Sequence, residues 1–296
     1  MNTQEKDSIQ QLKESINTAL HSYLPSASDR PQELHAAMRY SICEGGKRVR
    51  ALLLLLCSNL YNQPKDPLPA CAAIECIHAY SLIHDDLPVM DDSSMRRNKP
   101  SCHVAFDEAT ALLAGDALLT QAFVLLSKHY AEHPQLGLYL SQILSTASSS
   151  SGMIGGQKED IDNEGKPVDS DTLEYIHENK TAKLIQAAVL MGFAFAPEGA
   201  CSLSHTDREM LGYHIGMTFQ YIDDLLDVQS DSSTLGKPTG KDSDLEKLTS
   251  IKVHGIEGTQ QRANEHSDQA LALLQGMPEQ TETLQSFIQS LRQRIN

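Results

Sequence analysis

The chain of 296 residues contains no tryptophan and only six phenylalanines, and aromatic residues make up 5% of it. Runs of valine, isoleucine and threonine that alternate with polar residues are also missing. Such alternation is the pattern of a half-buried β-strand. Its absence argues against a fold built on β-sheets.

Cysteine usage excludes the common metal and disulfide frameworks. None of the six cysteines forms a C-x-x-C pair, and most of them lie inside apolar stretches. Buried reduced thiols explain this pattern better than a zinc site or a disulfide framework does. We therefore expect a protein of a reducing compartment.

Positive charge and long apolar runs are scarce as well. The 24 Lys and Arg residues stand against 39 Asp and Glu residues, and this formal charge of −15 argues against binding to a nucleic-acid backbone. The longest apolar runs, Ala51–Cys57 and Ala187–Pro197, are shorter than the roughly 18 residues of a membrane span. The polar start, MNTQEKDSIQ, lacks the apolar segment of a signal peptide. We expect a cytoplasmic protein with no nucleic-acid partner and no stable membrane insertion.

What the sequence does contain is helical periodicity. Apolar residues recur at spacings of three and four, as in an amphipathic helix, over residues 12–23, 112–126, 184–191 and 271–291. Proline- and glycine-containing breakers separate these segments, but no long Gly/Ser linker divides the chain. We expect one all-α domain over residues 1–296.

Two aspartate clusters follow apolar helical stretches. Residues 84–92 read HDDLPVMDD and residues 223–227 read DDLLD. Asp223 and Asp227 are four apart and share a helical face. Asp85 and Asp91 would diverge on a continuous helix, so we expect Pro88 to make the helix end or bulge after Leu87 and to bring Asp91 back.

Clustered carboxylates repel one another unless a positive group lies between them. Oxygen ligands of this kind suit Mg²⁺, which commonly bridges protein carboxylates to substrate phosphates. A solvated acidic surface would explain one such cluster, but two clusters at the ends of apolar helices favour a metal site.

Cations stand at defined places despite the acidic composition. Residues 45–50 read GGKRVR, in which Lys47 and Arg50 would share a face while Arg48 points elsewhere. Further candidates are the adjacent Arg96 and Arg97, the pair Lys180 and Thr181, Gln220 one turn before the second acidic cluster, and Lys237. Two acid clusters with dispersed cations fit two diphosphates held side by side, one bridged by metal and one held by Arg and Lys.

Eight blocks, in order along about two-thirds of the chain, resemble the trans-isoprenyl diphosphate synthases, and most closely the bacterial enzymes that make farnesyl diphosphate. They are GGKRVR (45–50), ECIHAYSLIHDDLPVMDD (75–92), RR (96–97), AGDALL (114–119), GMIGGQ (152–157), HENKTAKL (177–184), FQYIDDLLD (219–227) and LGKPTGKD (235–242). The resemblance implies an all-α bundle around a central apolar cavity, and a homodimer.

The resemblance also implies a role for each matching position. Three Mg²⁺ ions, or Mn²⁺ in their place, would be held by Asp85, Asp86, Asp91 and Asp223, with Asp224 and Asp227 as secondary candidates. Arg96, Lys180 and Lys237 would contact the allylic diphosphate, and Lys47, Arg50, His78 and Arg97 the isopentenyl diphosphate. Thr181 and Gln220 would lie near the reacting allylic carbon. The catalytic set is thus Asp85, Asp91, Lys180, Thr181 and Gln220.

The implied reaction joins isopentenyl diphosphate to dimethylallyl or geranyl diphosphate and yields farnesyl diphosphate. Ionisation of the allylic diphosphate precedes condensation, and loss of a proton to pyrophosphate ends the reaction. Tyr80, about 7.5 Å before Asp85 along a helix, and the adjacent Ser81 would stop the growing product at C15. An ordinary core role for Tyr80 is the alternative, and it would allow a longer, geranylgeranyl product.

The chain departs from its close relatives at three positions near the first motif. Ser93 and Ser94 stand where further acids are usual, and Asn98 replaces a common glycine after the arginine pair. Asn98 bears on the turn that aims Arg96 and Arg97.

Other classes of protein share parts of the pattern. Glu75-x-x-His78 and Glu174-x-x-His177 would suit a di-iron bundle, but this hypothesis ignores both aspartate clusters. A class I terpene cyclase shares the first motif but usually lacks the second and the cations Lys47 and Arg50. A non-catalytic partner subunit typically loses one aspartate motif, whereas this chain keeps both.

Overall fold

The computed structural model describes residues 2–62, 65–166, 169–229 and 249–293. Its elements follow the sequence in the order α1 (Thr3–Tyr23), α2 (Gln32–Cys43), α3 (Val49–Ser58), α4 (Leu68–Asp85), β1 (Met95–Arg96), β2 (Lys99–Pro100), α5 (Cys102–Ala105), α6 (Glu108–His129), α7 (Pro134–Ser148), α8 (Met153–Asp162), α9 (Ser170–Ile176), the π-helix η1 (His177–Ala182), α10 (Lys183–Phe193), α11 (His205–Gln229), α14 (Ser250–Gln275) and α15 (Glu282–Arg292). Within the described residues, the two-residue hairpin β1–β2 is the only sheet. The expected all-α fold is confirmed.

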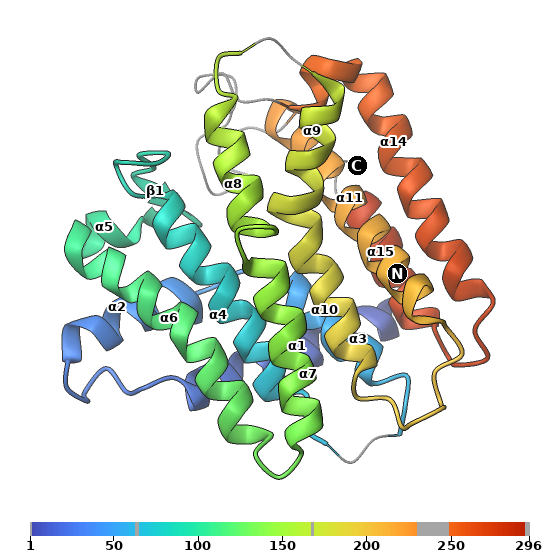
Figure 1. Ribbon diagram of the computed structural model, residues 1–296, viewed down its shortest axis with the longest axis horizontal. Helices are drawn as coiled ribbons and strands as arrows, with labels where there is room; N and C mark the ends of the chain where they lie inside the picture. Colours follow the sequence, from blue (N-terminus) through green and yellow to red (C-terminus); the bar gives the residue numbers. More distant parts are fainter. Residues whose placement is uncertain (1, 63–64, 167–168, 230–248, 294–296) are drawn as a thin grey trace.

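Local sequence explains where the helices start. Asn2 and Glu5 form a reciprocal capping box at the start of α1. The side chain of Asp107 accepts the backbone N–H of Thr110 and so caps α6. In Figure 1, α5 and α6 lie at the left, α14 at the right, and α8 and α9 between them.

The centre of the bundle is formed by apolar helices that are covered on every side. All ten residues of α3 are buried, as expected for a helix that is apolar all round. α4 packs against α3 and α6, and α10 packs against α3 and α11. All six cysteines are free thiols, of which four are buried and two half-buried, so the expectation of reduced thiols is confirmed.

Helix α6 is apolar over most of its length, although it contains no long unbroken apolar run. By length and composition it is the one helix in the described part of the chain that could cross a membrane, and 39% of its apolar window is buried inside the protein. Asp116 interrupts the run without making the helix polar. The same helix packs along α4, so its apolar character also serves the core.

Candidate active site

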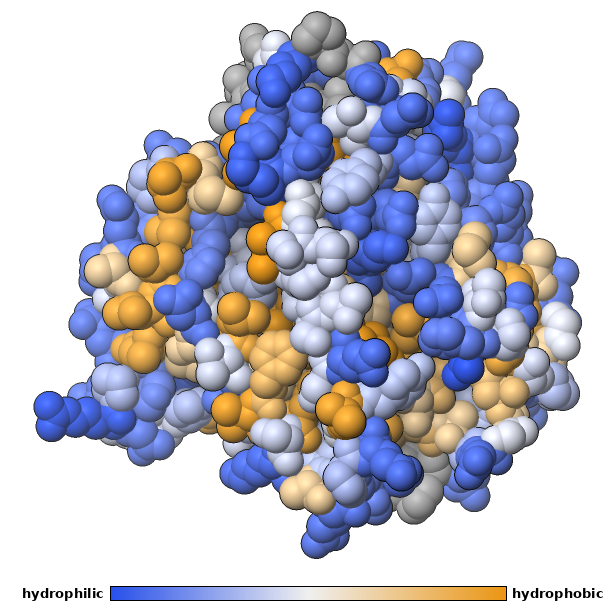
Figure 2. Space-filling view, viewed as in Figure 1, coloured by the Kyte–Doolittle hydropathy of each residue, from blue (hydrophilic) through white to orange (hydrophobic). Residues whose placement is uncertain are grey.

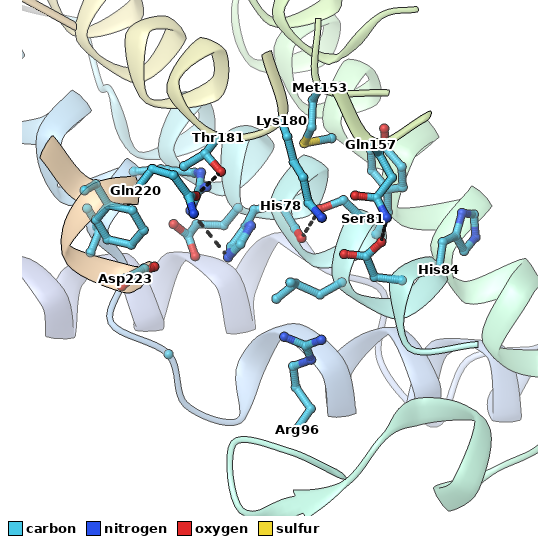
Figure 3. Close-up of a pocket in the computed structure, with 18 of the residues that line it drawn as sticks. His78, Ser81, His84, Arg96, Met153, Gln157, Lys180, Thr181, Gln220 and Asp223 are labelled. Carbon is cyan, nitrogen blue, oxygen red and sulfur yellow. Dashed lines mark hydrogen bonds between the residues drawn. The ribbon is translucent and has the colours of Figure 1, made fainter. Parts of the chain in front are cut away.

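A cavity of about 640 Å³ lies between α3, α4, α8, η1 and α11, and the hairpin at β1 closes one side. The sequence-predicted residues that line it are Lys47, Arg50, His78, Tyr80, Ser81, Asp85, Arg96, Arg97, Lys180, Thr181, Gln220, Asp223 and Asp227. In Figure 3, Lys180, Thr181 and Gln157 point toward the space beside His78 and Ser81, with Asp223 at the left and Arg96 below. The tertiary fold therefore gathers both aspartate motifs and the dispersed cations around one cavity.

The first aspartate motif lies where α4 ends. The helix ends at Asp85, two residues before the expected position, because a residue that precedes proline is driven out of the helical conformation and Pro88 cannot donate an N–H to the preceding turn. The chain then folds back, and the Asp91 N–H donates to the Asp85 carbonyl over 2.9 Å. The Asp85 carboxylate lines the cavity and accepts the Gln157 amide at 2.5 Å. Asp91 is half-buried outside the lining of the cavity.

Asp86, the second residue of this motif, is directed away from the cavity. Its carboxylate is buried and receives Arg96 at two points, from Nη2 at 2.6 Å and from Nε at 2.9 Å. Burial alone would lower the pKa of Arg96, but the bonds to Asp86 outweigh it and raise that pKa. Arg96 still lines the cavity, so a side chain predicted to bind diphosphate and an aspartate predicted to bind metal neutralise each other here.

The second motif lies on an unbroken helix. Asp223 and Asp227 of α11 line the cavity from the same helical face, as their spacing predicts. Asp224 is buried and faces the start of α14, where it accepts the Ser250 backbone N–H at 2.7 Å. The two motifs thus supply Asp85, Asp223 and Asp227 to the cavity.

Lys180 and Thr181 reach the cavity from the π-helix η1, a geometry that often marks functional sites. Lys180 Nζ lies 2.6 Å from the buried carboxylate of Asp160 on α8. Burial alone would lower the pKa of Lys180, but Asp160 and Asp85 outweigh it and raise that pKa, so the ammonium group is charged. The close packing of α8 requires Gly156, because a Cβ there would stand 2.2 Å from the Lys180 backbone nitrogen.

Sequence reasoning gave no role to two polar residues of α8. Gln157 contacts Asp85, and Asp160 contacts Lys180. Helix α8 therefore holds one acidic and one cationic side chain of the cavity. The signal in the sequence is the block GMIGGQ, which resembles the family and contains Gln157. The three-residue spacing of Gln157 and Asp160 places both on one helical face.

The cationic residues of the opposite wall lie in the loop before α3 and in its first turn. α3 starts at Val49, after Arg48 in a left-handed conformation with φ 55°, so Lys47 and Arg50 do not share a helical face. Both nevertheless line the cavity. Arg48 was expected to point elsewhere, but it also lines the cavity, where its guanidinium forms a buried ion pair with Glu75 at 3.2 Å.

His78 lies 3.5 Å from Arg50, measured from Nε2 to Nη1. Burial, followed by the charge of Arg50, lowers the pKa of His78 well below its ordinary value. The ring is therefore neutral near pH 7 and presents a hydrogen-bonding group, not a charge, to this wall.

Arg97 is held by the glycine pair ahead of Lys47. Its Nη1 donates to the Gly45 carbonyl at 3.1 Å, and a Cβ on Gly46 would stand 3.1 Å from its guanidinium carbon. Arg97 and Asn98 both have left-handed backbones, with φ of 55° and 62°. Asparagine tolerates this conformation better than most residues do, so Asn98 preserves the turn that a glycine would make.

The wall of the cavity includes the two residues predicted to limit product length. The Tyr80 ring is 4% exposed and meets the His84 ring edge-on, with centroids 5.8 Å apart. Burial raises the pKa of Tyr80 to about 12, and its hydroxyl has no hydrogen-bond partner among the described residues. The Ser81 hydroxyl donates to the His78 carbonyl at 2.9 Å. Both side chains line the cavity.

The donor set fits Mg²⁺ bound together with a substrate. Carboxylates from α4 and α11 face one cavity that Lys180 and Arg96 also line. Within residues 2–62, 65–166, 169–229 and 249–293, no three His, Cys, Asp or Glu side chains converge closely enough to hold an ion by themselves. Mg²⁺ suits this arrangement because it keeps several waters and uses few carboxylates plus phosphate oxygens.

The di-iron alternative does not fit the described contacts. Glu75 is bound to Arg48, and Glu174 is exposed, with its carboxylate near the Tyr213 hydroxyl. His177 faces Asp224 at 3.4 Å. Lys237, predicted to contact the allylic diphosphate, lies outside the described residues.

Comparison with known proteins agrees with this geometry. The family model described as polyprenyl synthetase matches residues 31–291. The chain belongs to the polyprenyl synthetase family. This polyprenyl synthetase is 41% identical over 273 residues to the farnesyl diphosphate synthase of Haemophilus influenzae, with 92% of each chain covered. It is 42% identical over 271 residues to that of Escherichia coli, with 90% of this chain and 89% of the relative covered.

A solved structure is similar to this polyprenyl synthetase in its fold over nearly the whole chain. The geranyltransferase of Helicobacter pylori, complexed with magnesium and isoprenyl diphosphate, has a TM-score of 0.83 and 31% sequence identity, with 98% of this chain and 97% of the other covered. The fold is accordingly the all-α isoprenoid synthase type. The matches favour a prenyl diphosphate synthase over a cyclase, because the relatives named above are synthases and transferases.

Proposed function

We propose that this polyprenyl synthetase is a magnesium-dependent farnesyl diphosphate synthase, which condenses isopentenyl diphosphate with dimethylallyl and then geranyl diphosphate. The observation that carries the proposal is the common cavity, which acids from two motifs, cations from two walls and Tyr80 all line. The identity of about 40% to farnesyl diphosphate synthases supports the product assignment.

The protein's own groups then divide the work between two diphosphates. Lys180 and Arg96, with Lys237, hold the allylic diphosphate and stabilise it as it leaves. Lys47, Arg50, Arg97 and the neutral His78 hold the isopentenyl diphosphate on the opposite wall. Thr181 and Gln220 lie beside the allylic carbon as positive charge develops, and the walls exclude water from it. The departing pyrophosphate takes the proton, so no side-chain base is needed.

Three Mg²⁺ ions, replaceable by Mn²⁺, would be held by Asp85, Asp91 and Asp223, with Asp86 reached once Arg96 turns to the substrate. The metal supplies charge neutralisation of the leaving diphosphate. The facing carboxylates of Asp85 and Asp223 support this assignment.

The Tyr80 ring, which lines the cavity on the helix that carries Asp85, favours a C15 product over a C20 product. A buried ring braced by His84 blocks further growth of an isoprenoid tail. A geranylgeranyl product remains the alternative outcome of the product assay.

We also propose a homodimer, formed through α6. Leu112, Leu113 and Val124 on this helix are 47%, 55% and 44% exposed, and Figure 2 shows apolar side chains at the surface on the α6 side of the molecule. An apolar helix face of this kind is typical of a protein–protein contact. Leu113→Asp should convert the dimer to a monomer in light scattering, whereas Leu138→Asp, on the exposed side of α7, should not.

We also propose that the chain forms a single domain and that it is located in the cytoplasm. The main apolar core takes buried side chains from both α1 and α15 and from most helices between them, which supports a single domain over residues 1–296. The free cysteines support a cytoplasmic, reducing location.

The deciding experiment incubates the purified chain with isopentenyl diphosphate and either dimethylallyl or geranyl diphosphate, with Mg²⁺ or with EDTA. A magnesium-dependent C15 product is the expected result. A C20 product would keep the enzyme class and remove the role of Tyr80. Release of pyrophosphate without incorporation of isopentenyl units would contradict the synthase proposal and point to a cyclase, and no turnover would point to a partner subunit.

A further inference from the structure

A chain of hydrogen bonds leads from the start of α14 to the cavity. The Ser250 N–H donates to Asp224 Oδ2 at 2.7 Å, Gln220 Nε2 donates to Asp224 Oδ1 at 2.7 Å, and Thr181 Oγ1 donates to Gln220 Oε1 at 2.6 Å. Thr181 and Gln220 line the cavity, while Asp224 is 5% exposed and lies behind them. Figure 3 shows the Thr181 and Gln220 ends of this chain meeting at the cavity wall.

The direction of every bond in this chain is set by chemistry. A backbone N–H can only donate, and an ionised carboxylate can only accept. Asp224 must therefore face the amide nitrogen of Gln220, which leaves the Gln220 oxygen toward Thr181. Thr181 has a single O–H, and the Gln220 oxygen takes it.

The fixed end of the chain is a helix terminus. Thr249, at the N-cap position of α14, makes no side-chain cap, so the first N–H groups of that helix need an acceptor from elsewhere. Asp224 supplies one from α11 to the short first segment of α14, which precedes the break at Gly255 (φ 69°). His177 Nε2, 3.4 Å from the same Oδ2, adds a second polar group on this side.

We propose that Asp224 is a positioning residue, which orients Gln220 and thereby makes Thr181 present oxygen lone pairs, and not its hydroxyl hydrogen, to the allylic cation. This inference rests on the proposed function. It also separates Asp224 from Asp223 and Asp227, because Asp224 acts through Gln220 and not as a metal ligand. Lone pairs stabilise positive charge at the reacting carbon, whereas an O–H hydrogen aimed at it would oppose ionisation.

Asp224→Asn tests this role with almost no change of shape. The oxygen of the new amide can still accept the Ser250 N–H, but its NH₂ group then faces Gln220. Gln220 must turn its own oxygen to this NH₂ group and its own NH₂ to Thr181, and the Thr181 O–H is released toward the cavity. We expect kcat to fall about 10- to 100-fold, with KM for both diphosphates and the half-saturating Mg²⁺ concentration changed less than threefold.

A second substitution should restore the original direction. In Asp224→Asn combined with Gln220→Glu, the amide introduced on α11 donates to the new carboxylate, whose other oxygen again accepts the Thr181 O–H. Gln220→Glu alone places two carboxylates side by side and should be less active than the wild type. We expect the double variant to be at least tenfold more active than either single variant, a coupling that a merely structural role of Asp224 would not produce.

Asp207→Asn is the matched control on the same helix. Asp207 accepts the Ser204 hydroxyl at 2.7 Å and does not line the cavity, so its kcat should equal that of the wild type. Circular dichroism and the thermal midpoint verify that each variant is folded.

Four results would overturn the proposal. The first is a kcat of Asp224→Asn within twofold of the wild type, and the second is no recovery of activity in the double variant. The third is a tenfold rise in the half-saturating Mg²⁺ concentration of Asp224→Asn, which would make Asp224 a metal ligand. The fourth is a loss of kcat in the Asp207→Asn control. Failure of the wild type to incorporate isopentenyl diphosphate is a separate outcome, because it overturns the proposed function and the catalytic role of the chain of hydrogen bonds with it.

Discussion

The two aspartate motifs differ in what holds their second aspartate. In the first motif Asp86 is bound by Arg96, a long side chain that is 29% exposed and lines the cavity. In the second motif Asp224 is bound by the Ser250 backbone N–H at the fixed start of α14. A side chain can exchange its partner for a substrate, whereas a backbone group in a helix terminus cannot. Two similar motifs thus differ in their second aspartate, whose contact is adjustable in the first motif and fixed in the second.

The backbone explains the difference between the motifs. Pro88 ends α4 at Asp85, so the first motif lies in a folded-back loop that also carries β1 and Arg96. No proline interrupts α11, so Asp223, Asp224 and Asp227 keep helical positions, and α14 packs behind them.

The largest effect on kcat is expected at the feature that the two motifs share, which is a first aspartate that lines the cavity. Asp85→Ala should lower kcat by about 10³-fold or more, because several kcal/mol of charge stabilisation at the leaving diphosphate is lost. Steady-state kinetics measures the loss, and helical circular dichroism should be unchanged. Near-wild-type turnover would refute the assignment of Asp85 to the metal site.

Product length tests whether Tyr80, on the same helix as Asp85 of the first motif, limits the growth of the product. Tyr80→Ala should shift the product from C15 toward C20 and longer chains, because it removes a bulky ring of α4 that lines the cavity. Chromatography of the products gives the distribution. Tyr80→Phe is the control, since the hydroxyl has no partner in the described residues and its loss should leave C15 dominant. An unchanged C15 product in the alanine variant would return Tyr80 to an ordinary core role.

Asp86→Asn tests the adjustable contact. The variant weakens the two-point bond to Arg96, and a lost charged hydrogen bond costs about 1.5–3 kcal/mol of stability. We expect a lower thermal midpoint and a change of less than tenfold in the KM of the allylic diphosphate, because Arg96 remains available to the substrate. A loss of kcat as large as that of Asp85→Ala would show instead that Asp86 is a required metal ligand.

The smallest expected effect is on the pH dependence of thermal stability, at the contact between α11 and α14 behind the second motif. His214 of α11 and His266 of α14 face each other with Nδ1 atoms 2.9 Å apart. Burial, followed by the neighbouring His214, lowers the pKa of His266 to about 4 in the folded protein. The unfolded chain, with an ordinary value near 6.5, binds the proton more readily, so the stability from this group is complete above about pH 6.5 and falls as the pH drops toward 4.

Thermal unfolding between pH 7.5 and 4.5 measures this dependence. His266→Gln should flatten the decline of the midpoint with falling pH, because the variant cannot take up the proton. His133→Gln, at an exposed histidine, should not alter the slope. Equal slopes in all three proteins would remove the α11–α14 pair as a source of acid sensitivity.

Much of the fold and the site could be predicted from residue patterns. Helical periodicity indicated the all-α class, and the four-residue spacing of Asp223 and Asp227 placed both on one face, because these features depend only on local geometry. The family resemblance named most of the charged residues that line the cavity, but it also named Asp86 and Asp91, which do not line it. Gln157 and Asp160 were not given roles, because their partners Asp85 and Lys180 are distant in sequence.

The sequence by itself determined the helices, their apolar faces, the end of α4 before Pro88 and the chemistry of the acids and cations. Only the tertiary structure decided that Asp86 faces Arg96 and that Asp224 faces α14. The physical reason is that a spacing sets the direction of a side chain relative to its own helix, whereas its partner depends on which helix packs against that face. In both motifs the second aspartate is directed away from the cavity, and the group that meets it there sets whether it can be released.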